Sequence, residues 1–150
     1  PEDVQIRFAA RDAVHIGCQD DQVRVTLAIE ELSKRPRRWN NFSVHVNYQP
    51  SEDVSEGRLV REGTIQLAGR RLNLGSQIAL RGVFSKIFSD DGLQFVPEKV
   101  KNDPRFENVE VTQLTITDGW MAAARGPKRV AAPRHALQAD KSIAGEYARQ

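Results

Sequence analysis

Four cations beside an aromatic side chain give the clearest chemical signal in the sequence, in the run Lys34–Trp39. Arginine and lysine side chains hold phosphate groups, of a nucleic acid or of a lipid headgroup, and a tryptophan stacks on bases or inserts at a membrane interface. The candidate binding residues in this run are Arg35, Arg37, Arg38 and Trp39. The alternative is a solvated loop in which Trp39 begins the next strand and covers the core.

The distribution of charge decides how far this basic run can be extended. Arg70-Arg71 and Lys128-Arg129 would enlarge it only if the fold brought them to it. The chain has 22 basic and 20 acidic residues, a net charge of +2, and residues 126–150 hold five of the basic and two of the acidic ones. Residues 1–125 are therefore nearly neutral, with 17 basic and 18 acidic side chains. Non-specific nucleic-acid affinity comes from neutralising phosphates, so this balance disfavours nucleic acid as the partner.

A second candidate site is an apolar stripe on a predicted helix, residues 77–88, for which Ser76 is the expected N-cap. Its apolar residues recur at the three- and four-residue spacing of one helix face. A helix on a curved sheet either fills the core or leaves a groove for an apolar ligand. The candidate ligand-binding residues are those of the stripe, with two aromatic residues opposite it: Leu80, Phe84, Ile87, Phe88, Phe95 and Trp120.

Catalytic and metal-binding patterns are weak. His15 and His45 fall on the polar faces of predicted strands, where solvated histidines are common. Cys18 alternates in phase with apolar residues, which predicts a buried, unreactive thiol. No glycine-rich phosphate loop, nucleophile elbow or metalloprotease signature is present in the sequence. We therefore predict a protein that is not an enzyme and that needs neither a metal nor another cofactor.

The rest of the sequence predicts the elements that position these residues. Asp118-Gly119 and Glu62-Gly63 each separate two strand-like runs and predict tight hairpins, and Ile29–Lys34 is expected to end in a helical turn. A single helix between groups of strands predicts an α+β fold, a curved antiparallel meander with the helix 77–88 packed on one face. The clearest strands alternate apolar with polar residues and cover 4–8, 14–18, 23–29 and 42–48.

The domain organisation follows from length and composition. Residues 1–125 are predicted to form one domain, and 126–150 a basic C-terminal extension that is peripheral or mobile. The lone cysteine excludes an internal disulfide, and no apolar run reaches the roughly 20 residues that span a bilayer. A start at Pro1, with Met121 as the one methionine, predicts a fragment or a processed chain. The compartment is therefore left open.

Part of the chain resembles a known class of proteins. The segment Gly63–Gly69, the predicted helix, Leu93–Val100 and the hairpin Val109–Ala124 are similar in rhythm to small exported β-rich domains of the tubular lipid-binding (TULIP-like) class. The similarity covers about residues 58–125. It implies long curved strands that wrap a helix, a concave face that holds acyl chains and an exported or envelope-associated location. The class carries a long N-terminal helix that this chain does not show before Val4, and it transfers no catalytic residues.

Three hypotheses follow. The first is a non-enzymatic module that binds an apolar or lipid-like ligand in an envelope-associated setting, with Arg37 and Arg38 near headgroups; it predicts an open hydrophobic concavity. The second is a protein–protein interaction or assembly domain, because exposed sheet edges pair with partners and a basic tail docks on acidic surfaces. The third is nucleic-acid binding through residues 34–39 and the tail, which the near-neutral body disfavours.

Overall fold

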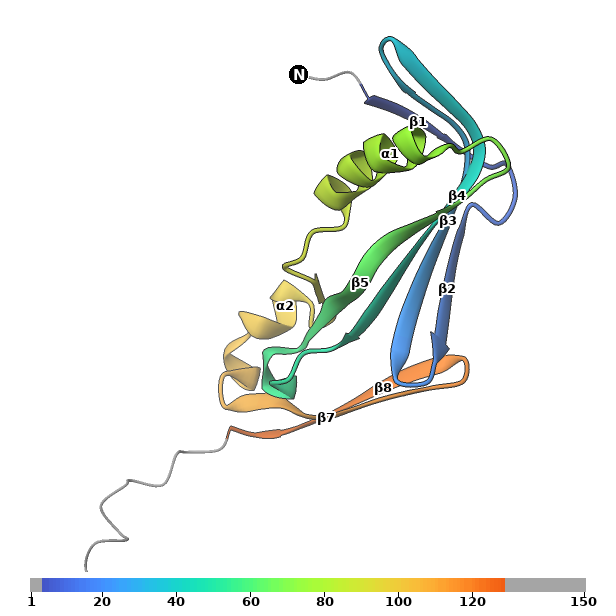
Figure 1. Cartoon of the computed structure of the whole chain (residues 1–150). Helices are drawn as coiled ribbons and strands as arrows, with labels where there is room; N and C mark the ends of the chain where they lie inside the picture. The colour runs from blue at the N-terminus through green and yellow to red at the C-terminus, as the bar shows by residue number, and fades with distance from the viewer. Residues whose placement is uncertain (1–3, 129–150) are drawn as a thin grey trace, which may run out of the picture.

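A computed structural model describes residues 4–128 of the chain and confirms the α+β fold (Figure 1). Most of the elements are antiparallel strands, with one long helix after the fifth of them. In chain order they are β1 (Val4–Phe8), β2 (Val14–Gln19), β3 (Gln22–Lys34), β4 (Arg37–Pro50), the 3-10 turn η1 (Val54–Glu56), β5 (Arg58–Ala68), α1 (Leu74–Ile87), β6 (Leu93–Gln94), α2 (Glu98–Lys101), the 3-10 turn η2 (Pro104–Phe106), β7 (Val109–Thr117) and β8 (Trp120–Pro127).

Six of the strands form one curled antiparallel sheet in the order β1-β3-β4-β5-β6. β2 pairs with β3 as well, so that β1 and β2 lie along the same side of that strand: β1 opposite its last six residues, Ile29–Lys34, and β2 opposite 22–27. β7 and β8 form a separate hairpin that crosses one end of the sheet, and α1 covers the other end (Figure 1).

In the long β3–β4 hairpin, the alternation of buried and exposed residues shifts by one position part-way along both strands. Ile29 pairs with Phe42 and Leu32 with Trp39, and all four side chains are buried. Two residues separate the buried pairs on each strand, where regular alternation would place one. Asn41 takes a left-handed conformation, with φ +54°, at this level. The two irregularities lie opposite each other, so the strands stay in register while the hairpin bends (Figure 1).

The hydrophobic core lies between the inner face of the sheet and α1. The ring of Phe84 meets that of Phe42 edge-on, with centroids 6.2 Å apart. Leu80 and Phe84 of the helix are fully buried, as are Val44 and Tyr48 of the central strand β4. Because the buried helix residues recur at three- and four-residue spacing, one face of α1 holds it on the sheet.

Three local predictions are corrected. The helix begins three residues earlier than predicted, because the Asn73 side chain, and not that of Ser76, accepts the capping hydrogen bond; its donor is the Ser76 N–H, at 2.8 Å. The segment 29–34 stays in β3 instead of ending in a helical turn. Glu62-Gly63 does not form a hairpin. The strand β5 continues through these residues and pairs with β4 on both sides of them, and Gly63, at φ +68°, lies in a β-bulge.

The hairpin predicted at Asp118-Gly119 is confirmed, with Thr117 paired to Trp120. Gly119 has φ +86°, which glycine adopts without steric cost, and its N–H donates to the Cys18 carbonyl oxygen at 2.9 Å. This bond fastens the tip of the β7–β8 hairpin to β2. The strand β8 runs to Pro127, two residues past the predicted domain boundary, and the rest of the predicted basic extension, 129–150, lies outside the described residues.

Within residues 4–128, no helix combines the length and the apolar character needed to cross a membrane. The longest, α1, has 14 residues. The sequence predicted no transmembrane segment, and for the described residues the helices agree with that prediction.

Candidate functional site

The residues predicted to line an apolar groove are divided between the core and the surface. Leu80 and Phe84 are fully buried, and Phe88 and Phe95 are partly buried against the same core. Ile87 and Trp120 are about half exposed, at 54% and 53%. The helix stripe therefore fills the space between α1 and the sheet. The inner face of the sheet exposes an apolar surface at another place.

Such a surface lies at β2, whose Val14 and Ile16 side chains are 55% and 63% exposed. They stand opposite Leu27 and Val25 of β3, which are only partly buried. The four side chains form a continuous apolar strip, here called the β2 strip. A contiguous exposed apolar surface is a mark of an interaction site.

The backbone of β2 is open along one side. The Ala28 N–H donates to the Ala13 carbonyl oxygen at 2.9 Å, so the odd-numbered residues of this segment hydrogen-bond to β3. In an antiparallel pair the even-numbered residues then direct their N–H and C=O groups away from β3. The Cys18 carbonyl, which accepts from Gly119, marks that outer edge. Val14 and Ile16 present their backbone groups along the same edge, and the described part of the sheet places no strand there.

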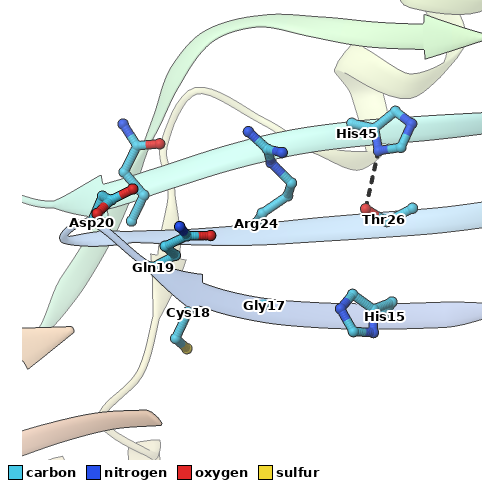
Figure 2. A pocket seen from close by; sticks show the side chains of 9 residues that line it. His15, Gly17, Cys18, Gln19, Asp20, Arg24, Thr26 and His45 are labelled. Carbon is cyan, nitrogen blue, oxygen red and sulfur yellow. Dashed lines mark hydrogen bonds between the residues drawn. The ribbon is translucent and has the colours of Figure 1, made fainter. Parts of the chain in front are cut away.

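The opposite face of β2 borders a polar cavity of about 400 Å³. Figure 2 shows His15 and Gln19 on the cavity side of the strand, while the Cys18 sulfur points the other way. Gly17 lies between His15 and Gln19 on this face and has no side chain. Its position therefore leaves a hollow between the two neighbouring side chains. The cavity is lined by His15, Gly17, Cys18, Gln19, Asp20, Gln22, Arg24, Thr26 and His45.

Hydrogen bonds fix the polar side chains around this cavity. His45 uses both ring nitrogens: Nδ1 lies 3.0 Å from the Thr26 hydroxyl and Nε2 lies 2.9 Å from the Ser43 hydroxyl. The Arg24 Nε–H donates to the Asn47 side-chain oxygen at 2.9 Å. A serine–histidine contact is part of the hydrolase triad, but here the second ring nitrogen meets a threonine hydroxyl where a triad has a carboxylate. Both His45 ring nitrogens thus have partners within the sheet, and these contacts fix the orientation of the ring.

Metal-ligating side chains do not gather in the described chain. Over residues 4–128, no group of three or more His, Cys, Asp or Glu side chains is placed to hold a metal ion. Cys18 is partly buried and packs against the core, which confirms its predicted burial only in part; Val14 and Ile16, with which it alternates in phase, are exposed.

The predicted basic residues lie at the far end of the same sheet, at the tip of the β3–β4 hairpin. Arg37 and Arg38 border a cavity of about 320 Å³ together with Arg71, from the loop before α1. Arg35 borders a neighbouring cavity of about 220 Å³. Trp39 is not on the surface: it is 8% exposed and belongs to the core. Lys128 follows β8, at the other end of the molecule (Figure 1).

The open edge of β2 was not predicted from the sequence. Alternation marked residues 14–18 as a half-buried strand, but it could not show which side of that strand lacks a neighbour. Edge position depends on strand order, and strand order depends on contacts far apart in the chain.

Comparison of the chain with known proteins found no related protein. No protein-family model matches the chain, and no curated protein or solved structure matches it significantly. The resemblance to the tubular lipid-binding class therefore stays a prediction.

Proposed function

We propose that this chain is a non-enzymatic binding module whose β2 edge accepts an extended strand of a protein partner. One observation carries the proposal: Val14 and Ile16 offer both an open backbone edge and more than half of an apolar side chain each. Exposed edges of this kind are templates for strand addition. In that mode backbone hydrogen bonds supply affinity, and side-chain pockets supply specificity.

The two faces of β2 define the sequence that would fit. Side chains of an added strand alternate between the faces of the sheet. Those on the inner face would cover the β2 strip and should be apolar. Those on the outer face would lie beside His15 and the hollow at Gly17, and should be polar. The proposed partner is therefore a segment with alternating apolar and polar residues.

Hydrogen exchange measured by NMR tests the edge directly. In the free chain the amide hydrogens of His15 and Gly17 should be protected by β3, and those of Val14 and Ile16 should exchange rapidly. Peptides selected from a random library against the whole chain supply the probe. A bound strand should protect Val14 and Ile16; binding peptides that leave both amides unprotected would refute the proposal.

Two substitutions at one position separate a strand from another apolar occupant. Ile16→Pro removes the outward N–H and should weaken a bound strand about tenfold, because a lost hydrogen bond with an orphaned partner costs about 1–3 kcal/mol. Ile16→Asp puts a charge in the β2 strip and should weaken any apolar occupant. A matched control, Gln94→Pro, alters the β6 edge, at the far side of the sheet.

An apolar or lipid-like ligand is the second candidate, favoured by the continuity of the β2 strip and by the lipid-binding resemblance. It would contact side chains and leave the backbone edge unused. Native mass spectrometry followed by lipid extraction tests it. A co-purifying apolar mass that Ile16→Asp removes and Ile16→Pro retains would favour the ligand over the strand.

A further inference from the structure

The basic residues at the hairpin tip line a cleft built from three separate segments. Arg37 and Arg38 come from the start of β4, Arg71 from the loop after β5, and Ser76 from the first turn of α1; all four border the 320 Å³ cavity. Arg37 also borders the adjoining 220 Å³ cavity, together with Lys34 and Arg35. Residues more than thirty positions apart in the sequence are thus joined in one cationic surface.

In the part of the chain that the structure describes, few carboxylates lie beside the arginines of this surface. Glu31 lies 3.7 Å from Arg38, but it also lies 3.6 Å from Arg7, which shares its charge. For Arg37 and Arg71, no carboxylate partner stands within 4.0 Å in the part of the chain that the structure describes. Arginines held beside a cavity without a counter-charge attract phosphate, which the guanidinium group binds with two parallel hydrogen bonds.

The surroundings of the cleft indicate what carries the phosphate. Leu74 and Ile78, one turn apart at the start of α1, are 71% and 61% exposed. They are two positions before and after Ser76, which borders the cleft, so they lie on the opposite side of the helix from it. A cationic cleft at a helix end whose outer face exposes aliphatic side chains suits the boundary between lipid headgroups and acyl chains. Base stacking needs an exposed aromatic face, and Trp39, the aromatic residue of this cleft, is 8% exposed.

We propose that the arginine cleft docks the protein on an anionic phospholipid surface. Arg37 and Arg71 bind headgroup phosphates, and Leu74 and Ile78 enter the interface from the outer face of α1. The helix end itself adds little, because Asn73 already accepts the Ser76 N–H. This surface lies at the opposite end of β3 from the β2–β3 turn, so the proposal stands or falls separately from strand binding at β2.

Vesicle co-sedimentation of the whole chain tests the docking. Vesicles of phosphatidylcholine with phosphatidylserine should bind, and vesicles of phosphatidylcholine alone should not. Each basic side chain near an anionic surface contributes about fivefold, so Arg37→Gln with Arg71→Gln should weaken binding roughly thirtyfold. The control pair Lys99→Gln with Lys101→Gln removes the same charge from α2, away from the cleft, and should weaken binding much less.

A second variant and two competitors separate the possible sources of phosphate. Leu74→Ser with Ile78→Ser leaves the charge unchanged and should still weaken vesicle binding, as a lipid surface requires. Inorganic phosphate at constant ionic strength should compete only weakly. Equal losses from the α2 and cleft charge variants would overturn the proposal. So would binding of a single-stranded oligonucleotide in preference to the vesicles, or full competition by inorganic phosphate.

Discussion

Two adjacent proline substitutions in β2 should destabilise the fold to different extents. His15→Pro removes an N–H that the alternation assigns to the β3 ladder, whereas Ile16→Pro removes one that faces the open edge. Proline is tolerated in a strand only where its missing N–H would face away from a neighbour. The two variants change neighbouring residues and introduce the same ring, so each is the control for the other.

The expected magnitudes follow from exposure and hydrogen bonding. Ile16 is 63% exposed, so its replacement loses little more than a third of the burial of an isoleucine side chain, about 0.5–1 kcal/mol. His15 is exposed and loses almost no packing, but His15→Pro breaks a ladder bond and leaves its acceptor without a partner, about 1–3 kcal/mol. The histidine variant should therefore be the less stable of the two, although it deletes the smaller buried surface.

Urea denaturation followed by circular dichroism measures the difference. For a chain of this size, 1 kcal/mol shifts the melting temperature by about 2–4 °C, so thermal melts should show the same order. Equal stabilities, or a less stable Ile16→Pro, would mean that Ile16 donates to a neighbouring strand. The assignment of the open edge, and with it the proposal of strand binding, would then be refuted.

Four other substitutions test the core, two turns and the helix cap. Tyr48→Phe should raise the free energy of unfolding by about 1 kcal/mol, because the buried hydroxyl has no hydrogen-bond partner in the described chain. Burial raises the pKa of Tyr48 above its ordinary value of 10.0, partly opposed by the nearby charge of Arg61, so the folded state favours the neutral phenol. Stability should therefore fall as the pH rises above 10.0, and denaturation curves of Tyr48→Phe should lack that part of the fall. Gly92→Ala should cost more than Gly119→Ala in urea melts, because both residues have positive φ but a Cβ at Gly92 would lie 2.1 Å from a backbone oxygen of β5. Asn73→Ala should lower stability by about 1 kcal/mol, measured in the same way, through loss of the α1 cap.

Much of the fold could be predicted because local patterns agree with it. The alternation of residues 42–48 and the spacing of Leu80 and Phe84 each report a face buried against the core. The pattern fails where the backbone is irregular. The buried residues Ile29 and Leu32 are three positions apart, so strict alternation ends the strand too early. A glycine at a bulge and a glycine at a turn also have the same local signature, which explains the false hairpin at Gly63.

The candidate sites were less predictable for a different reason. The basic run 34–38 was visible in the sequence, but its junction with Arg71 depends on the β5–α1 loop returning to the hairpin tip. Trp39 could be read as a surface aromatic or as a core residue, and only packing decides between them. The β2 edge depends on strand order alone.

The paired irregularity in the β3–β4 hairpin constrains how this chain can change in length. Deleting Glu30 and Asn41 together would leave one residue between the buried pairs on each strand, which restores regular alternation with Leu32 and Trp39 still facing inward. Deleting either residue alone would offset every cross-strand pair beyond the bend by one position. Insertions and deletions here should therefore be tolerated only as compensated pairs. A compensated pair of deletions would straighten the hairpin and re-aim its arginine-bearing tip, and it would also move the buried Leu32 and Trp39, which lie beyond the bend.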